Sequence, residues 1–249
     1  MTEFNNTRWA DKEFAEQYID NAEIYILERQ RMFGIMRSCI RHFLSGKKDI
    51  RVLDLGCGDG IVTSNVLDVD NSISATLVDA SAEMLEKAKE RFKGIRNIDY
   101  VKATFQEIVE NALPEKGYDV VVSSMAIHHL NMDEKQNFFA AISRHMRSGG
   151  HFINIDVVLP PSGPLDEWYM KLWEEWMDEK RAELKAFDEP SGDVIVRYKK
   201  GRENQPDTIE YQLDVLRSAG FTDVDCYYKY GIFVVYGGTK GDASYFPDI

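Results

Sequence analysis

The chain has 249 residues, 44% of them hydrophobic, which suits one globular domain with a sizeable core. Its formal net charge is -12 and its lysines and arginines are scattered, so binding to bulk nucleic acid or to an anionic membrane is disfavoured. Three widely spaced cysteines match neither a zinc site nor a disulfide framework, and no apolar run approaches the roughly 20 residues that cross a bilayer. The sequence therefore predicts a cytoplasmic protein without a metal.

The predicted elements begin with helices and then alternate. Residues 8–20 and 22–44 read as helices, and the segment "SGKKD" separates them from the first predicted strand. Ser81 is an expected helix N-cap, and Asn131 with Glu134 is an expected capping box. Strands are expected at 51–55, 75–78, 100–102, 118–123 and 151–158, with helices at 61–67, at 82–92 and from Asn131 onward.

The alternation stops after Val158, at "LPPSGP". Residues 165–185 read as a long helix, and a charged loop is expected up to Pro206. A further helix is expected at 207–218, with Asp207 and Glu210 as a capping box. The stretch "FTDVDCYYKYGIFVVYGG" reads as an antiparallel hairpin.

These elements predict an α/β fold with a doubly wound, mostly parallel sheet. The whole chain, 1–249, is expected to form one domain. Residues 1–45 are expected to be an N-terminal helical lid, and residues 159–206 a helical cap insertion before the hairpin.

The segment "VLDLGCGDG" places Gly56, Gly58 and Gly60 directly after a strand that carries Asp54. Glycines there let the backbone turn sharply and approach a ligand closely. Dinucleotide sites use G-x-G-x-x-G, one residue longer, and the carboxylate of Asp54 would repel a pyrophosphate but attract an ammonium group. Asp79 ends the next strand, at the spacing of an acid that binds ribose hydroxyls. S-adenosylmethionine (SAM), with an amino-acid end and an adenosine end, satisfies both acids.

Four segments, "VLDLGCGDG", "LVDAS", "YDVVVSSMAIHHL" and "RSGGHFINID", resemble in order the motifs of class I SAM-dependent methyltransferases. The resemblance covers residues 50–158 and 207–238. It implies a seven-stranded Rossmann-like sheet ending in an antiparallel hairpin, with SAM as methyl donor and S-adenosylhomocysteine (SAH) as product. A domain that binds a nicotinamide cofactor is the alternative.

The resemblance also implies roles for individual residues. The glycine loop would pass under the methionine part, and Asp54, or a water on it, would hold the amino group. Asp79 would take the ribose, Ala80 and Met84 would flank the adenine, and Thr104 with Phe105 would stand where the family often has an acid. The expected cofactor-binding residues are Asp54, Gly56, Cys57, Gly58, Asp59, Asp79, Ala80, Met84, Thr104, Phe105, Ser124 and Met125.

Candidate acceptor-binding and catalytic residues lie outside the glycine loop. The aromatic residues Trp9, Tyr18 and Tyr25 of the N-terminal segment are expected to cover the cofactor and contact the substrate. An aromatic stripe on the long helix, from Leu165 to Met177, could cap the substrate, form a dimer face or pack in the core. His128, His129 and Asp156 follow predicted strands at the expected mouth of the site and are candidates for proton removal from the acceptor.

The expected function is transfer of a methyl group from SAM to a small molecule, by a monomer or homodimer. The layout also resembles carboxy-SAM synthase, with Arg197 standing where that family holds the extra carboxylate. Methylation of a tRNA or a protein, and SAM binding without catalysis, are the remaining alternatives.

Overall fold

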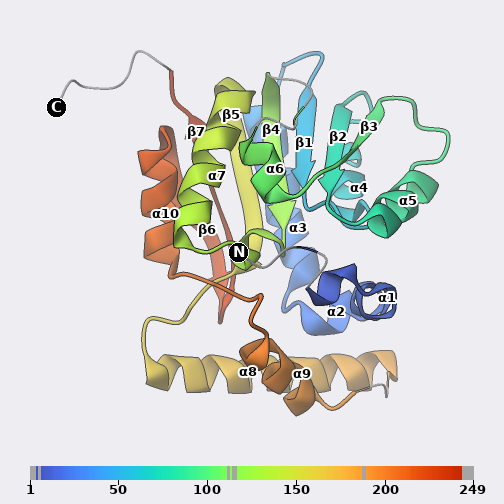
Figure 1. Ribbon diagram of the computed structural model, residues 1–249, viewed down its shortest axis with the longest axis vertical. Coiled ribbons are helices and arrows are strands. Elements are labelled where there is room, and N and C mark those ends of the chain that lie inside the picture. The colour runs from blue at the N-terminus through green and yellow to red at the C-terminus, as the bar shows by residue number, and fades with distance from the viewer. Residues whose placement is uncertain (1–3, 5–6, 111–112, 114–116, 187–188, 243–249) are drawn as a thin grey trace.

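The computed structural model describes residues 4, 7–110, 113, 117–186 and 189–242. One seven-stranded sheet forms the centre, in the order β3-β2-β1-β4-β5-β7-β6 (Figure 1). Neighbouring strands from β3 to β5 pair in parallel, whereas β7 is antiparallel to both β5 and β6. The strands are β1 (Arg51–Leu55), β2 (Ser74–Asp79), β3 (Ile98–Lys102), β4 (Tyr118–Ser124), β5 (Met146–Val157), β6 (Phe221–Tyr230) and β7 (Phe233–Lys240).

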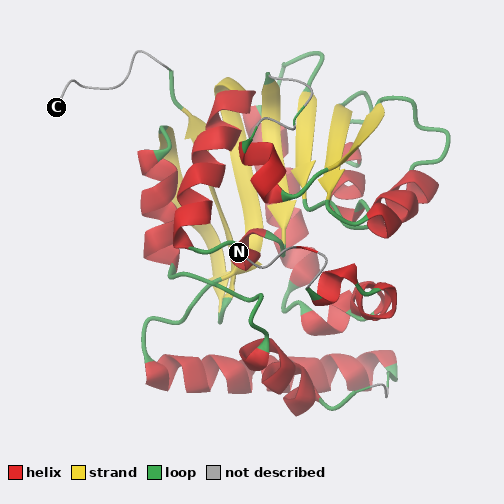
Figure 2. Ribbon diagram, in the orientation of Figure 1, coloured by secondary structure: helices red, strands yellow, loops and turns green. Residues whose placement is uncertain are grey.

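Helices cover both faces of this sheet (Figure 2). Alternate residues of the central strands point to opposite faces, so Val120 and Val122 join one apolar cluster and Val121 joins another. The first cluster includes α3 (Arg29–Phe43), α4 (Ile61–Leu67) and α5 (Ala82–Arg91), and the second includes α6 (Phe105–Val109), α7 (Met132–His145) and α10 (Ile209–Ser218). The predicted doubly wound α/β fold is confirmed.

A further layer of helices lies beyond the carboxyl ends of the parallel strands. In Figure 1, α1 (Lys12–Asp20) and α2 (Ala22–Tyr25) lie below the sheet, with α8 (Gly163–Leu184) and α9 (Ser191–Lys200) at the bottom. Trp173 of α8 donates a hydrogen bond of 2.8 Å from its indole nitrogen to the carbonyl of Tyr25 and packs edge-on against Phe233. The aromatic stripe of α8 therefore includes core-packing residues, while Trp168 is 56% exposed.

Most predicted elements of the sheet domain are confirmed. The helix at 61–67 has the predicted bounds, Ser81 caps α5 by accepting from the amide of Met84, and Asn131 with Glu134 forms the capping box of α7. The 231–232 turn closes the predicted hairpin.

Three predictions in the flanking segments are wrong. The helix expected over 22–44 is interrupted between α2 and α3, where Glu28 has a left-handed φ of 54°. The charged loop before Pro206 contains the helix α9, and Asp207 does not cap α10, because Thr208 does so. The carboxylate of Asp207 instead accepts a 2.5 Å hydrogen bond from the fully buried ammonium of Lys135, a contact made across 72 residues of chain.

Candidate active site

A cavity of about 520 Å³ lies at the carboxyl ends of the parallel strands. The strand register creates it: Leu55 is paired with Val78 on one side and with Ser123 on the other, so the chain segments after β1, β2 and β4 begin side by side. The segment after β3, the N-terminal segment and a loop from Arg202 to Gln205 complete the wall. Open α/β sheets bind ligands at this edge.

The glycine loop after β1 needs its glycines for conformation and for space. Gly56 has a φ of +66°, and a β-carbon there would lie 2.6 Å from the β-carbon of Ala126. Gly58 has a φ of +54°, but a β-carbon on it would meet nothing within 4 Å. The open side of Gly58 faces the cavity that it lines, together with Cys57 and Asp59. This leaves room for a ligand to lie against the backbone.

Asp79, at the end of β2, fixes this loop and lines the cavity. Its two carboxylate oxygens accept 2.8 Å hydrogen bonds, one from the amide of Gly58 and one from the amide of Ser81. Burial raises the pKa of Asp79, and the backbone hydrogen bonds partly oppose that change. Each oxygen keeps a second lone pair, so the carboxylate can also accept hydrogen bonds from two neighbouring hydroxyl groups.

Asp54 lies behind the glycine loop, fully buried and outside the cavity wall. One oxygen accepts hydrogen bonds from the amide (3.1 Å) and the hydroxyl (2.6 Å) of Thr63, while Oδ1 has no partner among the described residues. Burial raises the pKa of Asp54 to about 7. A buried carboxylate with one free oxygen fits a nearby cation such as the ammonium group of an amino acid, reached through water.

The expected adenine end is formed by Ala80, Met84, Thr104 and Phe105, which all line the cavity. Thr104 is also the N-cap of α6: its hydroxyl accepts a hydrogen bond from the amide of Glu107 and lies 3.0 Å from the carboxylate of that residue. The proton and one lone pair of this hydroxyl are therefore used within the protein, and one lone pair stays open. The expected contact from Thr104 to the adenine amino group stays a prediction.

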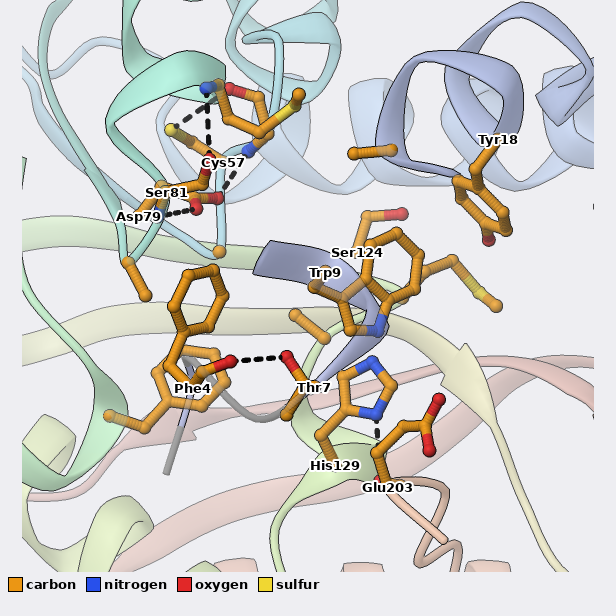
Figure 3. A pocket seen from close by; sticks show the side chains of 18 of the residues that line it. Phe4, Thr7, Trp9, Tyr18, Cys57, Asp79, Ser81, Ser124, His129 and Glu203 are labelled. Atoms are coloured by element: carbon orange, nitrogen blue, oxygen red, sulfur yellow. Dashed lines mark hydrogen bonds between the residues drawn. The ribbon is translucent and has the colours of Figure 1, made fainter. Parts of the chain in front are cut away.

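The opposite end of the cavity is aromatic. Trp9 lies edge-on to Tyr18, with ring centroids 4.9 Å apart, and 5.6 Å from the imidazole of His129. Ser124 and Met125, directly after β4, line the wall between the two ends (Figure 3 shows Ser124). Met125 holds a left-handed φ of 54°, an unfavourable conformation for this residue that often occurs at functional sites.

Of the three proton-removal candidates, only His129 lines the cavity. His128 and Asp156 are buried against each other, with 2.6 Å between the imidazole Nδ1 and the carboxylate. The same carboxylate accepts the backbone amide of His128 at 3.0 Å. Burial would raise the pKa of Asp156, but the charge and hydrogen bonds of His128 lower it overall. This pair holds the chain after β4 in place and does not reach the acceptor end, which corrects the catalytic expectation for both residues.

Two residues expected to contact the substrate also lie outside the cavity wall. Tyr25 is buried, and its hydroxyl is 3.3 Å from the carboxylate of Glu189. Arg197, on α9, forms an ion pair with the same Glu189 and faces the ring of Tyr25. These contacts join the N-terminal segment to α9. They give Arg197 a structural partner and correct its expected place in the site.

Several wall residues were not predicted from the sequence. Arg29 lines the cavity, pairs with Glu23 through Nη1 at 3.0 Å, and leaves its buried Nε without a partner in the described chain. Arg202, Glu203 and Gln205 come from the loop after α9. No motif marks any of these residues, because their place depends on packing between segments far apart in the sequence.

Two further findings concern other kinds of site. Across the described ranges, no group of three or more histidine, cysteine, aspartate or glutamate side chains could hold a metal ion. Within the same part of the chain, no helix is both long enough and apolar enough to span a bilayer.

The fold and the site together define a Rossmann-like α/β domain. A parallel sheet closed by an antiparallel hairpin, a glycine loop after β1 and an acid at the end of β2 are its defining features. Comparison with known proteins agrees: residues 52–150 match the family model described as a methyltransferase domain. Residues 52–150, less than half of the chain, are therefore similar to methyltransferase domains.

The curated proteins that this chain resembles include several named as methyltransferases. An uncharacterized methyltransferase of Geobacillus sp. (strain WCH70) is 27% identical over 145 residues, which are 58% of this chain and 64% of that protein. The malonyl-[acyl-carrier protein] O-methyltransferase 1 of Ilyobacter polytropus is 31% identical over 104 residues, 42% of this chain and 37% of that protein. The chain thus matches between about a third and two thirds of the length of these curated relatives.

Solved structures share the fold at low sequence identity. The CurJ carbon methyltransferase superimposes with a TM-score of 0.64 at 17% identity, covering 94% of this chain and 59% of that chain. Human N-acetylserotonin methyltransferase in complex with SAM gives a TM-score of 0.55 at 19% identity, covering 94% and 60%.

Proposed function

We propose that this protein is a SAM-dependent methyltransferase that acts on a small molecule. One observation carries the proposal: a single cavity joins the glycine loop and Asp79 at one end to Trp9 and His129 at the other (Figure 3). A methyl donor bound at the first end would have its reactive group directed along the wall formed by Ser124 and Met125. The acceptor would then occupy the aromatic end.

The chain's own residues supply binding and orientation. Asp79 accepts hydrogen bonds from the ribose hydroxyls, and Asp54 attracts the ammonium group across the loop backbone. Arg29 offers a guanidinium to the carboxylate of the methionine part, since its Nε is buried without a partner among the described residues. When bound, SAM supplies an electrophilic methyl group on a sulfonium. Methyl transfer needs alignment above all, so positioning by these residues accounts for much of the expected acceleration.

The walls of the acceptor end support a small molecule as substrate. They come from the N-terminal segment, from His129 after β4 and from the loop at 202–205. An ion pair between Arg8 and Glu203 joins the first of these segments to the last. We infer that the N-terminal helices act as a lid. The helices of the 159–206 insertion do not line the cavity, so its contribution to the acceptor end comes through the return loop alone.

Two other acceptor classes remain as outcomes of the test. Relatives named malonyl-[acyl-carrier protein] O-methyltransferases suggest an acceptor carried on a protein. The alternative of carboxy-SAM synthesis depends on Arg197, whose guanidinium pairs with Glu189 away from the cavity. Arg202, exposed at the cavity, is a different cation that an anionic group could reach.

The first experiment is mass spectrometry of small molecules released from the purified, denatured protein, followed by calorimetric titration of SAH. SAM or SAH is expected in the released fraction, and SAH is expected to bind. A released species heavier than SAM by a carboxyl group would favour carboxy-SAM synthesis, and absence of SAH binding by the folded protein would refute the proposal.

The acceptor class is tested with methyl-labelled SAM and fractionated cell extract. Label is expected in the small-molecule fraction. Label confined to protein or RNA would refute the proposed acceptor class while leaving the methyl donor intact. Asp79→Ala should abolish labelling, and Asp99→Ala, an exposed acid on β3, is the matched control.

A further inference from the structure

Two buried polar atoms at the acceptor end have no hydrogen-bond partner in the described part of the chain: the indole Nε1 of Trp9 and the imidazole Nε2 of His129. Both residues line the cavity, and Figure 3 shows the two nitrogen atoms directed toward each other. Leaving such buried atoms unpaired is unfavourable, because each has lost its hydrogen bond to water. A pair of unsatisfied groups on facing rings is the signature of a site completed by another molecule.

The chemical character of each atom is fixed. An indole nitrogen can only donate a hydrogen bond. His129 Nδ1 lies 2.9 Å from the backbone carbonyl of Glu203, which can only accept, so Nδ1 carries the proton of the neutral ring. Burial and the nearby charge of His128 lower the pKa of His129 to about 3, so the ring is neutral at pH 7 and Nε2 presents a lone pair. The site therefore offers one donor and one acceptor.

We propose that Trp9 and His129 together bind the nucleophilic hydroxyl group of the acceptor, so that this enzyme methylates oxygen in an alcohol, enol or phenol. A hydroxyl group donates one hydrogen bond and accepts others, which matches both nitrogens at once. A carboxylate carries no hydrogen and would face the lone pair of Nε2, so this geometry disfavours acids as the methylated group. The inference rests on the proposed function and specifies its acceptor.

The arrangement also assigns the proton. In the transfer, the hydroxyl oxygen gains the methyl carbon and loses its proton to His129 Nε2, while the electron pair of the broken methyl–sulfur bond stays on the cofactor sulfur. An oxygen that is acquiring a methyl group is strongly acidic, so even a weakly basic imidazole accepts its proton. The imidazolium then releases the proton to solvent as the product leaves, because its buried position disfavours the charge.

The test uses the full chain bound to SAH, with nitrogen-15 labels on histidine and tryptophan. The resonances of His129 should report the neutral Nδ1–H form at pH 7. Phenol should shift the His129 Nε2 and Trp9 indole signals, whereas anisole and benzoate should not shift the Nε2 signal. His42, exposed on α3, provides the histidine control.

Variants then separate the two contacts. Trp9→Phe keeps an aromatic ring and removes the donor, and it should weaken phenol binding about three- to ten-fold without changing SAH binding. His129→Phe should have a similar effect on phenol. Trp168→Phe, at an exposed indole on α8, should change neither.

Three results would overturn the proposal: an Nε2–H tautomer or a charged ring at His129, no response of either nitrogen to phenol, or tighter binding of benzoate than of phenol at these atoms. SAH binding that persists in any of these cases leaves the proposed function standing. Failure of SAH to bind the unmodified protein refutes the proposed function instead.

Discussion

The acid at the end of β2 should dominate the affinity for the cofactor. Asp79→Ala removes a carboxylate that faces the cavity with an accepting lone pair on each oxygen, and it also releases the amides of Gly58 and Ser81. A hydrogen bond to a charged group contributes about 1.5–3 kcal/mol, so losing two such contacts to ribose hydroxyls should cost at least about 3 kcal/mol. That loss corresponds to a Kd for SAH raised roughly 100-fold.

Thr104→Ala is the matched comparison. The hydroxyl of Thr104 already bonds within the capping box of α6, so its loss should change the Kd for SAH less than about 3-fold. It should instead lower the free energy of unfolding by about 1 kcal/mol, the usual effect of removing a helix cap.

Isothermal titration calorimetry with SAH measures both affinities, and circular dichroism confirms that each variant is folded. Asp79→Asn keeps one accepting oxygen, so its Kd for SAH should lie between those of Asp79→Ala and Thr104→Ala. The proposed role of Asp79 is refuted if Thr104→Ala weakens SAH binding more than Asp79→Ala does. It is refuted as well if a folded Asp79→Ala protein binds SAH within about 3-fold of the unmodified chain.

Three further predictions concern the same edge of the sheet. Gly56→Ala should lower the free energy of unfolding in urea by about 2 kcal/mol or more, because the added methyl group overpacks against Ala126. Gly58→Ala has open space and only a positive φ to oppose it, so it should lower the free energy of unfolding by about 1 kcal/mol. Equal losses would contradict a steric role for Gly56. Burial raises the pKa of Asp54 to about 7, so its contribution to the free energy of unfolding is complete below its unfolded pKa of about 4 and is lost as the pH rises through 7. Urea titrations at pH 5 and pH 8 should therefore show a smaller difference in stability for Asp54→Asn than for the unmodified chain. An equal difference would contradict the raised pKa of Asp54. Arg197→Ala should lower the melting temperature but leave the Kd for SAH within about two-fold, since its guanidinium pairs with Glu189 outside the cavity; a ten-fold weaker Kd would return Arg197 to the site.

The sequence predicted the sheet domain well because the residues that define each strand, turn and helix cap lie close together in the chain. The strand β1, the glycine turn and α4 are fixed by an apolar run, by positive φ values and by helical spacing, all within 17 residues. The caps at Ser81 and Asn131 likewise use side chains three residues from the amides they accept. Such features need no knowledge of distant segments.

The errors have the opposite cause. The sequence around Asp207 fits a capping box, but the buried ammonium of Lys135 takes its carboxylate, and a buried charge requires its partner more strongly than a helix end requires a cap. The chain leaves the helical conformation between α2 and α3, where Glu28 has a left-handed φ of 54°, and helical periodicity does not show this break. His128 was singled out by its position after β4, yet its ring is directed to Asp156.

The sequence pointed to Trp9, Tyr18 and His129 at the acceptor end but not to the return loop, because three distant segments build this end. Gln205 donates its amide to the carbonyl of His128 at 2.8 Å, and Lys135 holds the carbonyl of the same Gln205 at 2.5 Å, so the return loop of the insertion is fixed to α7 and to the end of β4. These contacts set the place of Glu203, whose carbonyl fixes the tautomer of His129 and whose side chain pairs with Arg8 beside Trp9. The insertion therefore reaches the acceptor end through this loop, by backbone groups and by the side chain of Glu203. Under the proposed acceptor roles of Trp9 and His129, a change in the length of this loop should alter which acceptor fits against these two residues.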